Sequence, residues 1–493
     1  MEPNVIISKK NEAYLKLTCD PHILYELSPY FTFEVPSAKF MKGNKYKRWD
    51  GQIHLLNVHN GEIYVGLLDK LIEKIKSHEY TYEFKDNKIY GLPYEENELI
   101  SYEGVKEYMS SIINSKYTPR DYQIDAVTDA LKYNRKLLIS PTSSGKSMMI
   151  YAITRYYTHK NYNTLIIVPT TSLVEQLHKD FEDYGWISDE YVHKIYSGRE
   201  KITNKQVTIS TYQSIYDMEK SYFNNFDVVI VDEAHQAKSK SITGILNKML
   251  DTKYRFGFTG TLDGSQTNKW VLEGLFGPSY KVTRTDELMR QGSIAQLQIE
   301  VIILQHTGRN FQEYNDEIEY LISHEKRNNF IKNLALDLKG NTLILYSRVE
   351  THGCILYELI NNDVSDERKV FFVHGGVDAE EREKIREITE NETNAIIIAS
   401  YGVFSTGVSI RNLHNLIFAS PSKSRIRNLQ SIGRILRKSN TKNEAILYDI
   451  SDDITYNSRK NYTLKHLIER IKIYTEENFN YIIHKINFKD KHG

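Results

Sequence analysis

The segment Leu137–Ser147 reads LLISPTSSGKS, and it decides the fold of the chain around it. Its apolar start predicts a buried parallel strand. A turn of small residues follows, and Lys146 and Ser147 then open a helical pattern. In a loop between a strand and a helix, backbone N–H groups point at phosphate oxygens and the helix N-terminus adds partial positive charge. The segment therefore predicts a phosphate-binding loop.

The residue types in this loop predict how a nucleotide is held. Lys146 is expected to reach the β- and γ-phosphates, and the Ser147 hydroxyl to bind Mg²⁺. The pattern has one departure, because Ser140 stands where the first glycine is usual. The alternative is a strand–turn–helix that carries Gly-Lys-Ser by coincidence. The residues assigned to nucleotide binding here are Pro141, Thr142, Ser143, Ser144, Gly145, Lys146 and Ser147.

A glutamine lies a short distance before the loop, in YTPRDYQIDAV. The amide of Gln123 can pair with the edge of an adenine, as glutamine does in base recognition elsewhere. We assign Gln123 and its neighbour Arg120 to nucleotide binding. The alternative is an ordinary glutamine at the start of a helix.

Two carboxylates follow the apolar run Val228–Val231. The carboxyl ends of parallel strands are where ligands bind in open sheets. Asp232 is expected to hold Mg²⁺ through water, and Glu233 to orient and deprotonate the attacking water. Adjacent buried carboxylates are costly without a cation or polar partners, which argues against a purely structural role.

Hydroxyl residues follow two other apolar runs. Thr170 and Thr171 come after TLIIVP, and Thr211 ends VTIST. Hydroxyls and N–H groups at a helix start suit a nucleic-acid backbone phosphate. A plain helix N-cap is the alternative reading of the same residues.

A second alternating series of strands and helices starts near Asn341. Within it, no Asp or Glu occurs between Thr393 and Asn443, a span that carries eight Lys or Arg residues. The span ends in QSIGRILR, where we expect Arg434 and Arg437 to share one helix face. Arginines from a second domain can stabilise charge developing on a γ-phosphate, so these two are candidate arginine fingers. The alternative is a solvated basic helix.

Residues 1–112 predict a separate small domain of mixed strands and helices. Its segment 39–49 reads KFMKGNKYKRW and interleaves cations with aromatics. Cations neutralise phosphates and aromatics stack on bases, so a nucleic-acid contact is expected. The alternative is a solvated hairpin with Trp49 in the core. The candidate contacts are Lys42, Lys45, Lys47, Arg48 and Trp49.

Composition sets limits on the whole chain of 493 residues. Its 64 basic and 64 acidic side chains cancel, so global charge does not indicate nucleic-acid binding. The two cysteines, Cys19 and Cys354, form no pair motif. No apolar run approaches the ~20 residues that cross a membrane, and the first residues lack a signal-peptide core. We expect a cytoplasmic protein without a membrane partner, in the host cytoplasm if a phage encodes it.

The ordered motifs resemble those of superfamily 2 helicases and translocases. The matching segments are the Gln123 region, PTSSGKS, VPTTSL, TYQS, DEAH, TGT, SYGVFSTGVSI and QSIGRILR. The resemblance spans residues from about 113 to 450. It implies two RecA-like lobes with ATP and Mg²⁺ in the cleft and a nucleic-acid strand across both. It also implies that Thr170, Thr171, Thr211 and Thr406 grip the backbone and that Gly407 lies near the nucleotide.

The segment KYKRWDGQIHLL, with TGTLDG and ASYGVFSTGVSI, is similar to UvsW-type phage helicases. That resemblance implies an α/β protein with two RecA-like, doubly wound parallel-sheet lobes preceded by a small α+β DNA-binding domain. The expected divisions are residues 1–112, 113–282, 283–455 and a helical tail at 456–493 that packs on the second lobe.

The same resemblance implies an ATP-dependent DNA helicase that moves branched junctions, regresses forks and dissociates D-loops and R-loops, with 3′ to 5′ polarity. We expect a monomer that binds forked or four-way DNA, and a phage single-strand-binding protein or recombinase is a candidate partner. The alternatives are an RNA-remodelling helicase, an ATP-gated binding or annealing protein without unwinding, and the motor of a restriction system.

Overall fold

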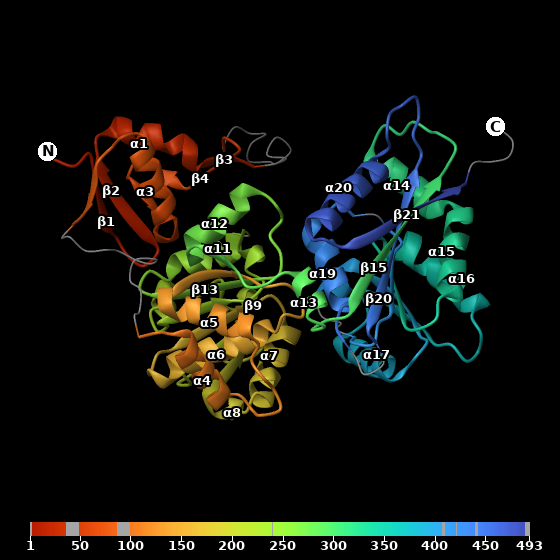
Figure 1. Ribbon diagram of the computed structural model, residues 1–493, viewed down its shortest axis with the longest axis horizontal. Helices are drawn as coiled ribbons and strands as arrows, with labels where there is room; N and C mark the ends of the chain where they lie inside the picture. The colour runs from red at the N-terminus through yellow and green to blue at the C-terminus, as the bar shows by residue number, and fades with distance from the viewer. Residues whose placement is uncertain are drawn as a thin grey trace. The chain divides into compact units, whose positions relative to one another are not determined.

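The structure is a computed structural model that describes residues 2–35, 49–85, 99–238, 240–406, 410–420, 422–438 and 442–488. It divides into two compact units (Figure 1). One unit comprises residues 1–140 and 145–282. The other comprises residues 283–493 together with residues 141–144 of the phosphate loop. No helix among the described residues is long and apolar enough to span a bilayer.

The first unit begins with a small α+β domain. Its five-stranded sheet has the order β5-β6-β2-β1-β7, with helices α1 and α3 beside it (Figure 1). Neighbouring strands β4 and β5 belong to different sheets of this domain. The elements are β1 (Val5–Lys9), β2 (Tyr14–Cys19), α1 (Pro21–Leu27), β3 (Thr32–Glu34), β4 (Gln52–His54), β5 (Leu56–Asn57), β6 (Glu62–Tyr64), α3 (Leu68–Ser77) and β7 (Tyr82–Phe84), with β3 and β4 paired apart from the main sheet.

This domain shares a core with the lobe that follows it. Trp270 of α12 (Gln266–Phe276) is 5% exposed and packs with Tyr30, Phe31 and Phe33. A side chain at Gly66 would have its Cβ 2.0 Å from the carbonyl oxygen of Glu273, so only glycine permits this approach. The backbone of the N-terminal domain at Gly66 therefore packs directly against the backbone of α12.

The first lobe is a seven-stranded parallel sheet of order β10-β11-β9-β12-β13-β8-β14. Its apolar strands are buried on both faces, as parallel sheets require. One core joins the sheet to α4–α7, and another joins it to α9–α12. The strands are β8 (Arg135–Ile139), β9 (Thr164–Val168), β10 (Val192–Ile195), β11 (Val207–Thr211), β12 (Val228–Val231), β13 (Tyr254–Thr259) and β14 (Ser279–Lys281). The other helices are α4 (Tyr102–Ile112), α5 (Asp121–Tyr133), α6 (Lys146–His159), α7 (Thr171–Asp183), α8 (Ser188–Tyr191), α9 (Tyr212–Ile215), α10 (Lys220–Phe223) and α11 (Lys240–Lys248).

The second lobe repeats this topology in the order β17-β18-β16-β19-β20-β15-β21, again all parallel. Position by position, β15 corresponds to β8, β16 to β9, and β19 to β12. The strands are β15 (Gln296–Gln305), β16 (Thr342–Tyr346), β17 (Val370–Val373), β18 (Ile396–Ser400), β19 (Asn415–Phe418), β20 (Glu444–Asp453) and β21 (Asn480–Asn487). The helices are α13 (Thr285–Arg290), α14 (Tyr314–Ser323), α15 (Glu325–Asp337), α16 (Cys354–Asp363), α17 (Ala379–Asn391), α18 (Tyr401–Thr406), α19 (Arg425–Ile435) and α20 (Tyr462–Glu476). The expected fold class, with two RecA-like lobes, is confirmed.

One sequence-based expectation fails in this lobe, and one strand was not predicted. The unpredicted strand is β15, which pairs with both β20 and β21. The expected helical tail is helical only to Glu476, because β21 then completes the sheet beside β15. An apolar run of this length suits a helix or a strand equally. Pairing with a partner distant in sequence decides between them.

Candidate nucleotide-binding and DNA-binding sites

The phosphate loop follows β8 and leads into α6, as predicted. Ser140 is fully buried and its N–H donates to the carbonyl oxygen of Thr259 at 2.8 Å, so serine fits the first position of the motif. Two loop residues have left-handed backbones, Ser143 with φ +67° and Gly145 with φ +81°. Such angles favour glycine, which explains the glycine before Lys146. Lys146 and Ser147 then lie in the first turn of α6.

Gln123 lies against this loop. A Cβ added to Gly145 would be 2.3 Å from Gln123 Nε2, so the glutamine amide packs against the glycine. Gln123 is 3% exposed, and its Oε1 accepts a hydrogen bond from the Arg120 N–H at 2.9 Å, which caps α5. The Arg120 guanidinium donates a hydrogen bond to the Tyr122 hydroxyl. The helix-start role of Gln123 is therefore realised, and adenine recognition stays a prediction.

The two carboxylates after β12 lie beside the loop lysine. Lys146 Nζ is 3.7 Å from Glu233 Oε1, and the Glu233 N–H donates to Asp232 Oδ1 at 2.9 Å. Glu233 has a left-handed backbone, with φ +51°. Burial, and then the charge of Glu233, raise the pKa of Asp232 to about 6, while Lys146 opposes the shift. One lysine facing two crowded carboxylates fits a site that takes up a divalent cation.

His235 connects these carboxylates to β13, a role that our sequence reasoning did not assign. Its Nδ1 is 3.3 Å from Glu233 Oε2 and 3.1 Å from the hydroxyl oxygen of Thr259. The Thr259 hydroxyl donates to the Thr261 carbonyl at 3.1 Å. In the sequence, the histidine that ends the DEAH motif was the feature that could have indicated this role. This contact places the TGT segment next to the carboxylates.

Ser147 has a partner that the sequence did not predict. Its Oγ is 2.8 Å from the hydroxyl of Tyr184, which lies just after α7. Tyr184 is 8% exposed and packs edge-on against Tyr117. Burial raises the pKa of this phenol, so it stays protonated and neutral. The phenol therefore fixes the direction of the hydroxyl that is expected to bind Mg²⁺.

The threonines expected to contact nucleic acid occupy helix starts in the first lobe. Thr170 caps α7, with its Oγ1 accepting from the Leu173 N–H at 3.4 Å. Thr171 is exposed beside it. Thr211 is 5% exposed, and its hydroxyl lies 2.8 Å from that of Ser214. The N-cap reading is thus realised for Thr170, while backbone contact stays a prediction for all three.

Several other candidates lie partly or wholly outside the described residues. Trp49 is half-buried and its indole N–H donates to the Gln52 carbonyl at 2.8 Å. Thr406 ends α18, and its side chain is not among those described. The residues outside the described ranges are Lys42, Lys45, Lys47, Arg48 and Gly407.

The basic span of the second lobe does not present all of its cations. Arg425 pairs with Glu476 and Glu477. Lys442 is 1% exposed, donates to three backbone carbonyls, and has its pKa lowered to about 7 by burial. Arg434 lies over the Phe404 ring at 5.2 Å. Helix α19 ends at Ile435, so the expectation that Arg437 lies in the same helix is wrong.

Family comparisons match three parts of the chain. Residues 5–85 match the family described as DNA helicase UvsW, N-terminal. Residues 116–264 match the res subunit of type III restriction enzymes, and residues 325–439 match the helicase conserved C-terminal domain. Together these matches cover the N-terminal domain and both lobes.

Individual proteins agree with these matches. The ATP-dependent DNA helicase uvsW of Enterobacteria phage T4 is 34% identical, over 96% of this chain and 98% of its own. The DNA 3′-5′ translocase XPB2 of Sulfurisphaera tokodaii is 25% identical over 69% of this chain and 82% of its own. The crystal structure of T4 UvsW superimposes with a TM-score of 0.52 and 31% identity, covering 98% of this chain and 99% of that one. The chain therefore belongs to the UvsW-type helicases, a family of ATP-dependent DNA helicases.

Proposed function

We propose that this helicase remodels branched DNA, by migrating four-way junctions, regressing forks and dissociating D-loops and R-loops, and that it translocates 3′ to 5′. The observation that carries the proposal is the UvsW-type N-terminal domain over residues 5–85, docked on the ATP-binding lobe. The polarity is supported by the relative named as a 3′-5′ translocase.

The docked domain supports a junction-directed role on physical grounds. Lys70 Nζ pairs with the buried Glu273 carboxylate at 2.9 Å, and Trp270 packs into the core of the domain. A domain docked in this way keeps its core in a constant position relative to Lys146 and Ser147 of the first lobe. We infer that a duplex arm bound by this domain is held while the motor moves another strand. The cations Lys42, Lys45, Lys47 and Arg48, together with Trp49, are the proposed contact.

The first lobe supplies the proposed hydrolytic site. Lys146 binds the β- and γ-phosphates, and the loop residues 142–145 surround them with N–H groups. Glu233 orients the attacking water and accepts its proton, and its contacts with Lys146 and His235 hold the carboxylate in place. Gln123 and Arg120 bind the adenine. These roles are assigned from the residues and their contacts.

Mg²⁺ fits this site because Asp232 and Ser147 offer oxygen ligands beside a crowded pair of carboxylates. When bound, Mg²⁺ neutralises phosphate charge. Ser147 and Asp232 hold it, and the Tyr184 hydroxyl orients the serine oxygen. Arg434 and Arg437 from the second lobe act as arginine fingers, and Gly407 lies near the nucleotide. Hydrolysis then depends on closure of the lobes.

Grip on the backbone is proposed for Thr170, Thr171, Thr211 and Thr406. Phosphate contacts carry no sequence information, so movement is independent of sequence and sensitive to salt. The proposed working form is a monomer on forked or four-way DNA. A phage single-strand-binding protein or recombinase is the proposed partner class.

The first experiment measures ATP hydrolysis without polymer and with single strands, linear duplex, a synthetic four-way junction or RNA. Wild type is compared with Glu233→Gln. Strongest stimulation by the junction, lost in the variant, is the expected result. Stimulation by RNA alone would move the assignment to RNA remodelling. Junction binding and annealing without strand displacement would leave an ATP-gated annealing protein.

A second experiment tests the N-terminal contact. Lys42, Lys45, Lys47 and Arg48 are changed together to Gln, and Lys70 stays unchanged because it supports the docking. We expect weaker junction binding with a flatter salt dependence and unchanged ATP hydrolysis without DNA. Unchanged junction affinity would return the segment to a structural role.

A further inference from the structure

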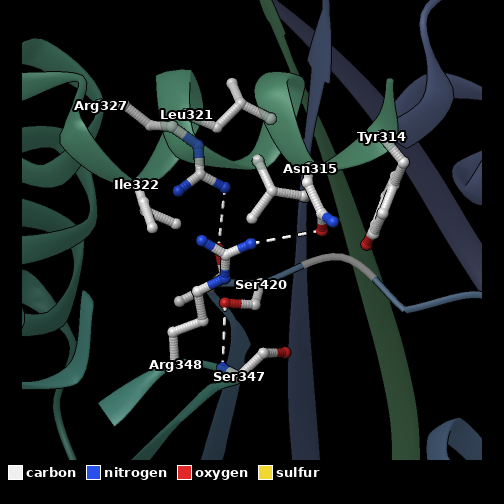
Figure 2. Close-up of a pocket in the computed structure, with 10 residues that line it drawn as sticks. Tyr314, Asn315, Leu321, Ile322, Arg327, Ser347, Arg348 and Ser420 are labelled. Carbon is white, nitrogen blue, oxygen red and sulfur yellow. Dashed lines mark hydrogen bonds between the residues drawn. The ribbon is translucent and has the colours of Figure 1, made fainter. Parts of the chain in front are cut away.

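A cavity of about 150 Å³ lies in the second lobe at the carboxyl ends of β16 and β19 (Figure 2). Its walls come from α14, the start of α15 and the residues that follow the two strands. The polar side chains lining it belong to Tyr314, Asn315, Arg327, Ser347, Arg348 and Ser420.

This cavity occupies the place that the nucleotide site has in the first lobe. In the two sheets, β16 corresponds to β9, β19 to β12, and β15 to β8. Helix α14 follows β15 as α6 follows β8, so Tyr314 and Asn315 begin the helix that matches the phosphate-loop helix. Counted from the ends of β19 and β12, Ala419 matches Asp232 and Ser420 matches Glu233.

Arg327 brings a buried positive charge to this place. Its side chain is 1% exposed. Its Nε donates to both oxygens of Asp452 at 3.0 Å, and its Nη2 donates to the Ala419 carbonyl at 2.8 Å. Its Nη1 is buried and has no hydrogen-bond partner among the described residues. A buried N–H of this kind is costly unless something accepts from it.

Arg348 adds a second charge from the opposite wall. Figure 2 shows its guanidinium facing that of Arg327 across the cavity. Its contacts with Asn315 and Glu319 are both 3.4 Å long, and the Glu319 side chain is 69% exposed. A surface pair of this geometry contributes little, so it neutralises Arg348 only in part. Ser420 Oγ accepts from the Ser347 N–H at 3.2 Å and lies 3.2 Å from Nδ1 of the buried His352, so protein groups hold this hydroxyl.

We propose that this cavity binds a phosphate group and does so without a metal ion. Two guanidinium groups, one of which has a buried N–H without a partner among the described residues, are donors that suit an oxyanion. None of the residues lining the described cavity is a carboxylate, which removes the reason for a bridging cation. Sites for drug-sized ligands occupy about 300–1,000 Å³, so this volume suits one phosphate group rather than a whole nucleotide.

The phosphate group has two sources to distinguish, a phosphodiester of the DNA backbone and free inorganic phosphate. The first arm of the experiment tests whether the cavity binds phosphate. It uses Lys146→Ala protein with EDTA, which removes the lysine of the first-lobe loop and any bound metal. Binding of inorganic phosphate is measured by calorimetry. Adding Arg348→Gln should weaken it at least about tenfold, as loss of a charged hydrogen bond predicts. The control is Arg382→Gln, on α17 away from the cavity. Arg348 is used because removing Arg327 would leave Asp452 buried without its partner.

The second arm identifies the source. DNA with one neutral methylphosphonate at successive backbone positions is titrated against wild type and Arg348→Gln. If the DNA backbone supplies the phosphate, one position weakens wild-type binding and has no effect in the variant, and the salt slope falls by about 1. Phosphate binding that depends on Arg348 without such a position assigns the site to free phosphate. Equal behaviour of Arg348→Gln and Arg382→Gln in both arms overturns the proposal.

Discussion

The two lobes share one sheet topology, yet the residues at matching strand ends differ. In the first lobe, β8 leads into Gly145-Lys146-Ser147 and Asp232 directly follows β12. In the second, β15 leads into His306–Glu313, which lacks a Gly-Lys-Ser sequence, and Ala419 directly follows β19. The sheet therefore supplies a place for a ligand in each lobe, and a few residues decide the chemistry.

The charged side chains at the strand ends of each lobe explain which ligand that site suits. Lys146 stands against two carboxylates, an arrangement that suits a phosphate accompanied by a divalent cation. Arg327 and Arg348 face a cavity whose described lining has no carboxylate, which suits a phosphate alone. The proposals therefore contrast a metal-dependent first lobe with a metal-free second one.

Lys146→Ala should reduce ATP hydrolysis to the background of the buffer, because this lysine is the proposed contact of the transferring phosphate. Arg348→Gln, its counterpart in the second lobe, should leave hydrolysis without DNA unchanged. Steady-state phosphate release measures both, with DNA binding as the check on folding. Retained turnover in Lys146→Ala would refute the phosphate-loop assignment.

Arg437→Ala should lower turnover about 1,000-fold while changing nucleotide affinity little, as expected for an arginine finger. Arg425→Ala is the matched control, because Arg425 already pairs with Glu476 and Glu477. Single-turnover hydrolysis and nucleotide titration separate the two effects. A loss confined to affinity would argue against a finger role.

Acid should weaken Mg²⁺-dependent nucleotide binding in the first lobe. The pKa of Asp232 is raised from 3.8 to about 6, so the carboxylate that we propose for Mg²⁺ is lost as pH falls through that value. Below it, binding should fall about tenfold per pH unit. Glu233→Gln removes a charge that raises this pKa, so the acid limb should move to lower pH.

Titration with a fluorescent ATP analogue between about pH 5 and pH 7 measures this fall of nucleotide affinity in acid. Nucleotide binding in EDTA is the control, because affinity without Mg²⁺ should not show the same fall. An acid limb that stays in place or moves upward in Glu233→Gln would contradict the coupling of the two carboxylates.

Tyr184→Phe should give the smallest effect. It removes one hydrogen bond to Ser147 Oγ, worth about 1 kcal/mol, so the Mg²⁺ midpoint of nucleotide binding should rise about fivefold. Tyr117→Phe, on the neighbouring ring, should leave the midpoint unchanged. Phosphate binding by the second lobe should be the same in both. Equal midpoints in the two variants would show that Tyr184 serves only packing.

Sequence reasoning predicted the motifs and strands whose residues are contiguous in the chain. Gly145-Lys146-Ser147 and Asp232-Glu233 are contiguous, and their strands are apolar runs. It missed β15 and β21, because pairing between distant segments defines them. It also missed Arg327, since a charged residue in a helix predicts a solvent-facing position until Asp452 is seen beside it.

Trp270 has a consequence for how the chain can be divided. Helix α12 lies far from residue 112 in sequence, yet its tryptophan completes the core of the N-terminal domain. A chain started at residue 113 would expose that indole, and an isolated domain ending at 112 would lack part of its interior. Because α12 packs in both cores, gene fusions or domain exchanges that keep both parts folded must transfer the N-terminal domain and the first lobe together.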